Sequence, residues 1–142
     1  MAEAAIQSLV NDEKRVSVTS RGLLAPPQSV VHPLAVKACR AADLKIDKER
    51  PAVRLSFRDV HAADLILVME YAQRSALRRD FPAYTGKVYG LGHWQNVDIE
   101  DPLGGDEQRF VDCLSTIQTG VEAWLDRLRN MALAPAVRGP QR

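Results

Sequence analysis

The sequence has few cysteines, almost no net charge and no long apolar run, and each of these shortages excludes a class of protein. The two cysteines, Cys39 and Cys113, are too few for a disulfide framework and lack zinc-ligand spacing, so we expect neither a metal nor a cofactor. The formal net charge of +1 gives no electrostatic reason to expect nucleic acid or a membrane surface as a partner. No segment is long and apolar enough to cross a bilayer and no signal peptide opens the chain, so we expect a cytoplasmic protein.

What is present is the composition of one globular domain. The chain has 142 residues, of which 46% are hydrophobic and 26% are charged, values that are typical of a single domain with a real core. We place this domain at residues 1–131. Residues 132–142 are rich in Pro, Gly and Arg, which predicts a flexible tail.

The middle of the chain has the pattern of a strand, a helix and a second strand. Leu65–Met69 and Lys87–Leu91 are short apolar runs, and the charged segment Tyr71–Arg79 between them has a helical pattern. This order predicts a parallel pair of strands with a right-handed crossover. Because Leu65–Met69 is almost wholly apolar, we expect it to be a central strand covered by helices on both faces.

Helices and one further strand are expected on either side of this unit. Alternation of apolar residues predicts a strand at Arg15–Ser20. Helical periodicity or helix-start signals predict four further helices. The first is Met1–Val10, with Ala2, Ala5, Ile6 and Leu9 on one face, and the second is His32–Leu44, with Pro33 in its first turn. The third is a short helix capped by Ser56 and reaching His61, and the fourth is Asp106–Arg129.

The loop after the second apolar run carries Asp101 and Pro102. In an open α/β sheet, chemistry takes place beyond the carboxyl ends of the strands, which is where this loop would lie. Pro102 restricts its predecessor to an extended conformation and so sets the direction of the Asp101 carboxylate. Asp-Pro is also a common turn, and the dipeptide alone favours a structural role.

Three segments together resemble a known family: A-D-L-I-L-V-M-E (63–70), K-V-Y-G-L-G-H-W (87–94) and D-I-E-D-P-L-G-G (98–105). With T-S-R-G-L (19–23) upstream, they resemble the low-molecular-weight protein-tyrosine-phosphatases, above all the bacterial members associated with exopolysaccharide synthesis. The resemblance runs from Met1 to about Arg129. It implies an α/β three-layer sandwich with a small parallel sheet flanked by helices, and it implies that Asp101 is the general acid.

The family's nucleophile loop, C-x5-R-[ST], has no counterpart in these residues. The residue six positions after Cys39 is Lys45, and the residue six after Cys113 is Thr119. The match of M-A-E-A to the family places Met1 just after this loop, so the first central strand of the sheet is also missing. We therefore expect this chain not to hydrolyse phosphotyrosine at the family's rate. We also expect one of three consequences: Arg15–Ser20 and Leu65–Met69 pair directly, a second copy or another chain occupies the position of that strand, or the product begins upstream.

The resemblance suggests three substrate-binding positions. Ser20 matches the family serine that braces the phosphate loop, although the next residue, Arg21, departs from the family's small residue. Trp94 would either line a substrate cleft or only hold its loop in place by packing against the rest of the protein. Leu103 replaces the family's usual aromatic residue and so removes a flat ring that would grip a phenyl group.

Three functions remain open on this sequence. The first is a phosphatase whose nucleophile loop lies outside this chain. The second is a pseudophosphatase that binds a phosphotyrosine protein or a bacterial tyrosine kinase, and the third is a structural or oligomerisation module. Arg74, Arg78 and Arg79 in the central helix would form either a docking face for an acidic partner or an ordinary solvated surface.

Overall fold

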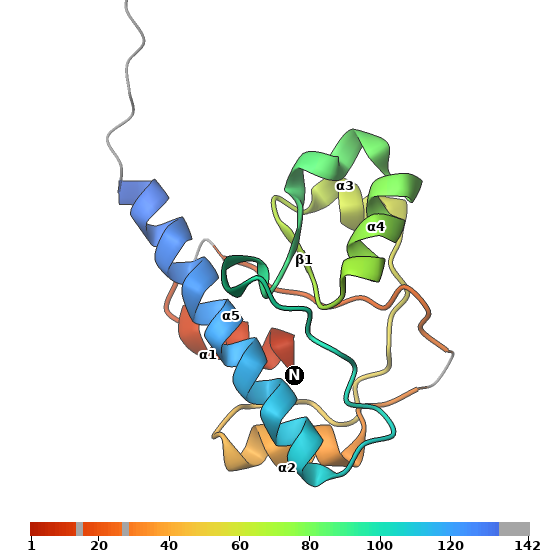
Figure 1. Ribbon diagram of the computed structural model, residues 1–142, viewed down its shortest axis with the longest axis vertical. Helices are drawn as coiled ribbons and strands as arrows, with labels where there is room; N and C mark the ends of the chain where they lie inside the picture. The colour runs from red at the N-terminus through yellow and green to blue at the C-terminus, as the bar shows by residue number, and fades with distance from the viewer. Residues whose placement is uncertain (14–15, 27–28, 134–142) are drawn as a thin grey trace, which may run out of the picture.

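The structure is a computed structural model that describes residues 1–13, 16–26 and 29–133. It confirms the predicted α/β class, with a small parallel sheet and helices around it (Figure 1). The elements in chain order are α1 (Ala2–Val10), α2 (Pro33–Ala41), α3 (Phe57–Ala62), β1 (Ile66–Val68), α4 (Tyr71–Asp80), the 3₁₀ helix η1 (Pro82–Lys87), β2 (Val88–Gly90), the 3₁₀ helix η2 (His93–Gln95) and α5 (Glu107–Leu133).

The predicted strand–helix–strand unit is confirmed. β1 and β2 pair in parallel, with Ile66 opposite Val88 and Val68 opposite Gly90, and α4 forms the connection between them. Each strand is three residues long and so is shorter than the apolar run that predicted it. Beyond β2, the amide of Leu91 donates to the carbonyl of Val68 at 2.8 Å.

The predicted strand at Arg15–Ser20 is wrong. Residues 16–20 are not assigned to a strand, and Arg15 lies outside the described residues. Alternating side chains describe an extended backbone, but a strand also needs a neighbour to complete its hydrogen bonds. The nearest pairing downstream is an isolated parallel bridge between Gly22 and Arg54, in which the amide of Gly22 donates to the Val53 carbonyl at 2.8 Å.

The predicted helix starts are confirmed to within a residue, whereas α2 ends earlier than predicted and α5 continues past Arg129 to Leu133. His32 caps α2 by accepting from the Leu34 amide at 3.2 Å, and Ser56 forms a capping box with Asp59 at the start of α3. α2 ends at Ala41 rather than Leu44, because Asp43 adopts a left-handed conformation with φ of 60°. The amide of Leu44 then bonds back to the Cys39 carbonyl at 2.8 Å, which is the Schellman pattern.

The main core lies where α1 and α2 pack on α5. The buried residues of α5 repeat every three or four positions, as predicted for an amphipathic helix: Phe110, Leu114, Ile117, Val121, Trp124 and Leu125. The predicted face of α1 is only partly correct, since Ala5 is buried but Leu9 is exposed, and Ala4 and Val10 are buried instead. A smaller apolar cluster of Val68, Leu77 and Val88 lies between the sheet and α4.

Among the described residues, no helix has both the length and the apolar content needed to span a bilayer. They also contain no group of three or more His, Cys, Asp or Glu side chains placed to hold a metal ion. The predicted domain boundary falls inside α5, which continues to Leu133, and residues 134–142 of the predicted tail lie outside the described part of the chain.

Candidate active site

The loop that carries Asp101 is held at the carboxyl end of β1. The amide of Ile99 donates to the carbonyl of Met69 at 3.0 Å, directly after β1 ends. Asp98 accepts a hydrogen bond from the Tyr71 amide at 2.8 Å, which ties the same loop to the first turn of α4. The side chain of Ile99 is buried in the main core. Two hydrogen bonds and one buried side chain thus fix the position of the chain just before Asp101.

Asp101 itself lies at an exposed turn. Its Oδ1 accepts from the Leu103 amide at 2.9 Å, while Pro102 is buried and its carbonyl accepts from the Gly105 amide at 2.9 Å. Gly104, inside this turn, has a φ of 83°, a conformation that favours glycine. The carboxylate therefore stands in solvent on a turn with internal hydrogen bonds. Such a group can hold or release a proton toward a bound ligand.

Cys113 lies beneath this turn, and its thiol donates to the Glu100 carbonyl at 3.7 Å. Burial raises the pKa of the Cys113 thiol, the negative charge of Asp101 raises it further, and the positive charges of the amino terminus and Arg109 oppose this rise. The bond from Cys113 thus places the residue before Asp101 against α5. The start of α1 lies near the centre of the ribbon in Figure 1.

Neither cysteine has the properties of a nucleophile. Cys39 is fully buried within α2, and burial raises the pKa of its thiol as well. Both thiols sit inside helices, where the surrounding amides already bond to the helix carbonyls. A reactive thiolate needs a lowered pKa from a helix start or a nearby cation, and the pKa of each of these thiols is raised instead.

The first turn of α1 carries a polar network that includes Ser20. The Glu3 carboxylate accepts from the Ser20 hydroxyl, from Arg50 Nη1 at 2.5 Å and from Gln7 Nε2 at 3.2 Å. Burial raises the pKa of the Glu3 carboxyl, but hydrogen bonds from Ser20 and Arg50 and the Arg50 charge outweigh it, so the pKa lies below its ordinary value. A role for Ser20 in substrate binding stays a prediction.

Sequence reasoning missed Glu3 and Arg50. An acidic residue in the first turn of a helix is favoured by the helix dipole, and that signal could have pointed to Glu3. The partner, Arg50, is 47 residues away in the chain, and no local pattern connects the two.

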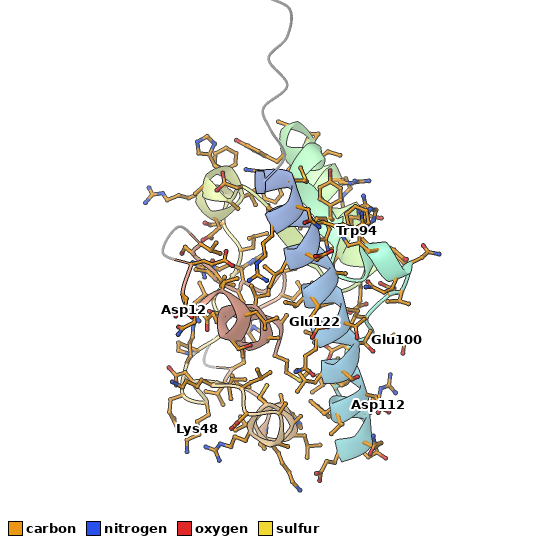
Figure 2. All side chains as sticks on the ribbon, turned by 90° about the vertical axis from the view of Figure 1, so that its left-hand side faces the viewer. Asp12, Lys48, Trp94, Glu100, Asp112 and Glu122 are labelled. Carbon is orange, nitrogen blue, oxygen red and sulfur yellow. The ribbon has the colours of Figure 1, made fainter. Side chains whose placement is uncertain are left out.

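Trp94 belongs to an aromatic cluster on α5. Its ring meets that of Trp124 at 5.3 Å between centroids, and the guanidinium of Arg127 lies 3.6 Å above it. Figure 2 shows Trp94 alongside α5. Trp124 Nε1 in turn donates to the carbonyls of Gly90 and Leu91. These contacts agree with the alternative in which Trp94 holds its loop against the rest of the protein, while substrate binding by Trp94 stays a prediction. Leu103 is 66% exposed beside Asp101 and is free to meet a ligand.

The arginines of α4 bond mainly to the sheet and to their own helix. Arg74 Nε and Arg78 Nη2 donate to the carbonyl of Val88 in β2 at 3.3 and 3.4 Å, and Arg79 pairs with the neighbouring Asp80 at 2.8 Å. Arg74 also lies over the ring of Tyr89 at 5.6 Å. These bonds leave the three side chains poorly placed to form one docking face.

Comparison with known proteins gives the family. A family model described as "Low molecular weight phosphotyrosine protein phosphatase" matches residues 1–133. The chain belongs to this family. It is 39% identical over 114 residues to the "Probable low molecular weight protein-tyrosine-phosphatase EpsP" of Ralstonia solanacearum, covering 80% of this chain and 78% of that protein. It is also 38% identical over 73 residues to a low molecular weight protein-tyrosine-phosphatase, Ptp, of Acinetobacter johnsonii, covering 51% of each protein.

Solved structures of phosphatases share the fold. The YwlE arginine phosphatase from Geobacillus stearothermophilus superposes with a TM-score of 0.83 at 18% identity, covering 99% of this chain and 89% of its own. Vibrio vulnificus Wzb in complex with benzylphosphonate superposes with a TM-score of 0.80 at 24% identity, covering 89% and 87%. At these identities the likeness shows the fold alone.

Proposed function

We propose that this phosphatase-family chain provides the scaffold and the acid-bearing loop of a phosphotyrosine site, with Asp101 as the general acid, and that these 142 residues alone do not turn over phosphotyrosine. The observation that carries the proposal is the Asp101 turn, which is anchored at the carboxyl end of β1 and at the first turn of α4. We propose that the first amides of α1 hold the anionic group of the ligand. Those amides have no intrahelical partner and form a ready anion site.

The acid role follows from the chemistry of the leaving group. When a phosphoryl group leaves tyrosine, the departing phenolate needs a proton, and an exposed carboxylic acid on an anchored turn can supply it. Leu103, next to this acid, would contact the aryl group through an aliphatic side chain. The names of the relatives support phosphotyrosine as the ligand, and we propose a cytoplasmic phosphotyrosine protein, such as a bacterial tyrosine kinase, as the partner.

The lack of turnover follows from the cysteines. The reaction needs a thiolate to attack phosphorus and an arginine that grips the phosphoryl oxygens. Cys39 and Cys113 have raised pKa values and lie within α2 and α5, and neither begins a C-x5-R pattern. Without the thiolate, an acid has no leaving group to protonate.

The first test is an assay of the purified chain with p-nitrophenyl phosphate and with a phosphotyrosine peptide. We expect no turnover above the buffer rate. Turnover that disappears in Asp101→Asn would contradict the proposed lack of activity while supporting the acid role. Binding of the phosphotyrosine peptide without turnover would favour the pseudophosphatase, and the absence of both would favour the structural module.

The acid role is tested separately by joining an apolar strand and a loop of the family pattern C-x5-R-S to Met1. We expect this extended chain to hydrolyse aryl phosphates and Asp101→Asn to lower its kcat by about 10²-fold or more. The loss should be larger for phenyl phosphate than for p-nitrophenyl phosphate, because the poorer leaving group depends more on the acid.

Asp112→Asn is the matched control for that experiment. Asp112 is an exposed carboxylate on α5 whose side chain is bonded to Gln108 at 2.8 Å, and its removal should leave kcat unchanged. Equal kcat values for Asp101→Asn and Asp112→Asn in an active extended chain would contradict the assignment of Asp101.

A further inference from the structure

A depression of about 430 Å³ lies beside α2, remote from the Asp101 turn in sequence. One face of α2 forms its side, because Pro33, Val36, Lys37 and Arg40 follow the helical spacing of three and four residues. Residues 30–31 and 48–49 complete the lining. Figure 2 shows Lys48 next to α2 at the lower end of the molecule. We call this surface the α2 depression.

The floor of the α2 depression is apolar. Val36 is buried, with 8% of its surface exposed, whereas Val30 at the edge is 60% exposed. A valine left this exposed beside other apolar side chains offers contact area that a ligand can cover. The depression therefore suits a ligand with an apolar group.

The rim of the α2 depression is positively charged. Three cations, Lys37, Arg40 and Lys48, surround it, and Glu49 is its one carboxylate. The net charge of the whole chain is only +1, so this surface concentrates positive charge. The pairs of Lys37 with Glu107 at 2.7 Å and of Lys48 with Glu49 at 3.5 Å have half or more of each side chain exposed. Such exposed pairs are weak and can exchange for a ligand carboxylate.

We propose that the α2 depression docks an acidic peptide segment that carries an apolar side chain. The apolar residue would cover Val30 and Val36, and its acidic neighbours would meet Arg40 and Lys48. A peptide fits better than a small enclosed ligand, because the four charged side chains at the rim, Lys37, Arg40, Lys48 and Glu49, are all exposed. This docking does not depend on the phosphatase chemistry proposed above.

A titration of the ¹⁵N-labelled chain with an acetylated and amidated octapeptide, Glu-Glu-Val-Glu-Asp-Val-Glu-Glu, tests the proposal. We expect the amide signals of residues 30–40 and 48–49 to shift, with an affinity that falls as salt is added. Lys48→Glu and Arg40→Glu should each weaken binding by about fivefold or more. Val30→Ser should also weaken it, while Val111→Ser, at an exposed valine of α5, should not.

Lys45→Glu is the matched charge control, since Lys45 is exposed on the same connection but does not line the depression. Equal losses of peptide affinity in Lys45→Glu and Lys48→Glu would show that the peptide is attracted by positive charge in general and not bound in the α2 depression, and would overturn the proposal. No shift at about 1 mM peptide, or equal binding of the Gln and Asn version of the peptide, would also overturn it. Phosphatidylglycerol vesicles that bind through Lys48 and displace the peptide would assign the surface to a membrane instead.

Discussion

At the scale of single residues, the Glu3 carboxylate holds a polar network that the sequence did not predict. It lies in the first turn of α1, with 14% of its side chain exposed, and receives hydrogen bonds from Ser20 and Arg50. These contacts join three parts of the chain that are distant in sequence. An ionised carboxylate is needed to accept all of them, so the network depends on pH.

The stability of the protein should therefore carry a Glu3-dependent part at neutral pH. Because the folded-state pKa of Glu3 is below the unfolded value of about 4.3, the carboxylate stabilises the fold above that pH, and the effect is lost as pH falls through the folded pKa. We expect Glu3→Gln to lower the free energy of unfolding by about 1 kcal/mol at pH 7 and by less below pH ~4. Urea unfolding at several pH values measures this.

Glu107→Gln provides the comparison for Glu3→Gln. Its pair with Lys37 leaves 51% of Glu107 and 62% of Lys37 exposed, so its loss should change the free energy of unfolding by less than about 0.5 kcal/mol. An equal effect of the two substitutions at pH 7, or a Glu3→Gln effect that does not vary with pH, would refute the pH-dependent network.

At the scale of elements, the loop before Asp101 depends on α4 for its position. The side chain of Asp98 accepts a hydrogen bond from the Tyr71 amide, which is the first amide of α4. The side chain of Glu70, the N-cap residue of α4, does not bond to this amide. The strands that the loop follows are only three residues long, and short strands by themselves are weak supports. The link from Asp98 to α4 therefore matters more than it would in a longer sheet.

Removing the Asp98 acceptor should loosen both α4 and the Asp101 loop. We expect Asp98→Ala to lower the free energy of unfolding by about 1 kcal/mol and to speed hydrogen exchange at the Tyr71 amide. Asp98→Asn keeps an acceptor oxygen and should retain most of the protection. Tyr71 exchange that is equally fast in Asp98→Asn and Asp98→Ala would show that charge, rather than the hydrogen bond, holds the loop.

At the scale of the whole molecule, the described residues leave β1 with β2 as its one strand partner. The edge of β1 away from β2 would be completed by another strand, and an open edge promotes association of chains. We propose that two copies associate through this region. We expect Val16, which is exposed on the segment of residues 16–20, to become buried on association.

Sedimentation equilibrium across a range of protein concentrations tests this association. We expect the apparent mass to rise above the monomer value of 15.7 kDa as concentration increases. Val16→Lys should shift the equilibrium toward the monomer, and Val111→Lys, on α5, should not, although the two valines are 44% and 39% exposed. A monomer at every concentration would contradict the proposal.

The sequence alone was sufficient to predict the elements whose signals are local. Apolar runs predicted the parallel pair of β1 and β2, the Ser56 cap and Pro33 predicted the starts of α3 and α2, and helical spacing predicted most of the buried face of α5. The family and the Asp101-Pro102 turn were predicted from short motifs. Each of these properties depends on residues within a few positions of one another.

Only the tertiary structure decided which residues meet. The strand expected at 16–20 failed because a strand requires a neighbour, and Leu9 is exposed because the partners of α1 set which of its faces is covered. The bond of Glu3 to Arg50, the placement of Trp94 on α5 and the Asp98 link to α4 join positions 27 or more residues apart. Such contacts arise from the packing of whole elements, and no local pattern of side chains encodes them.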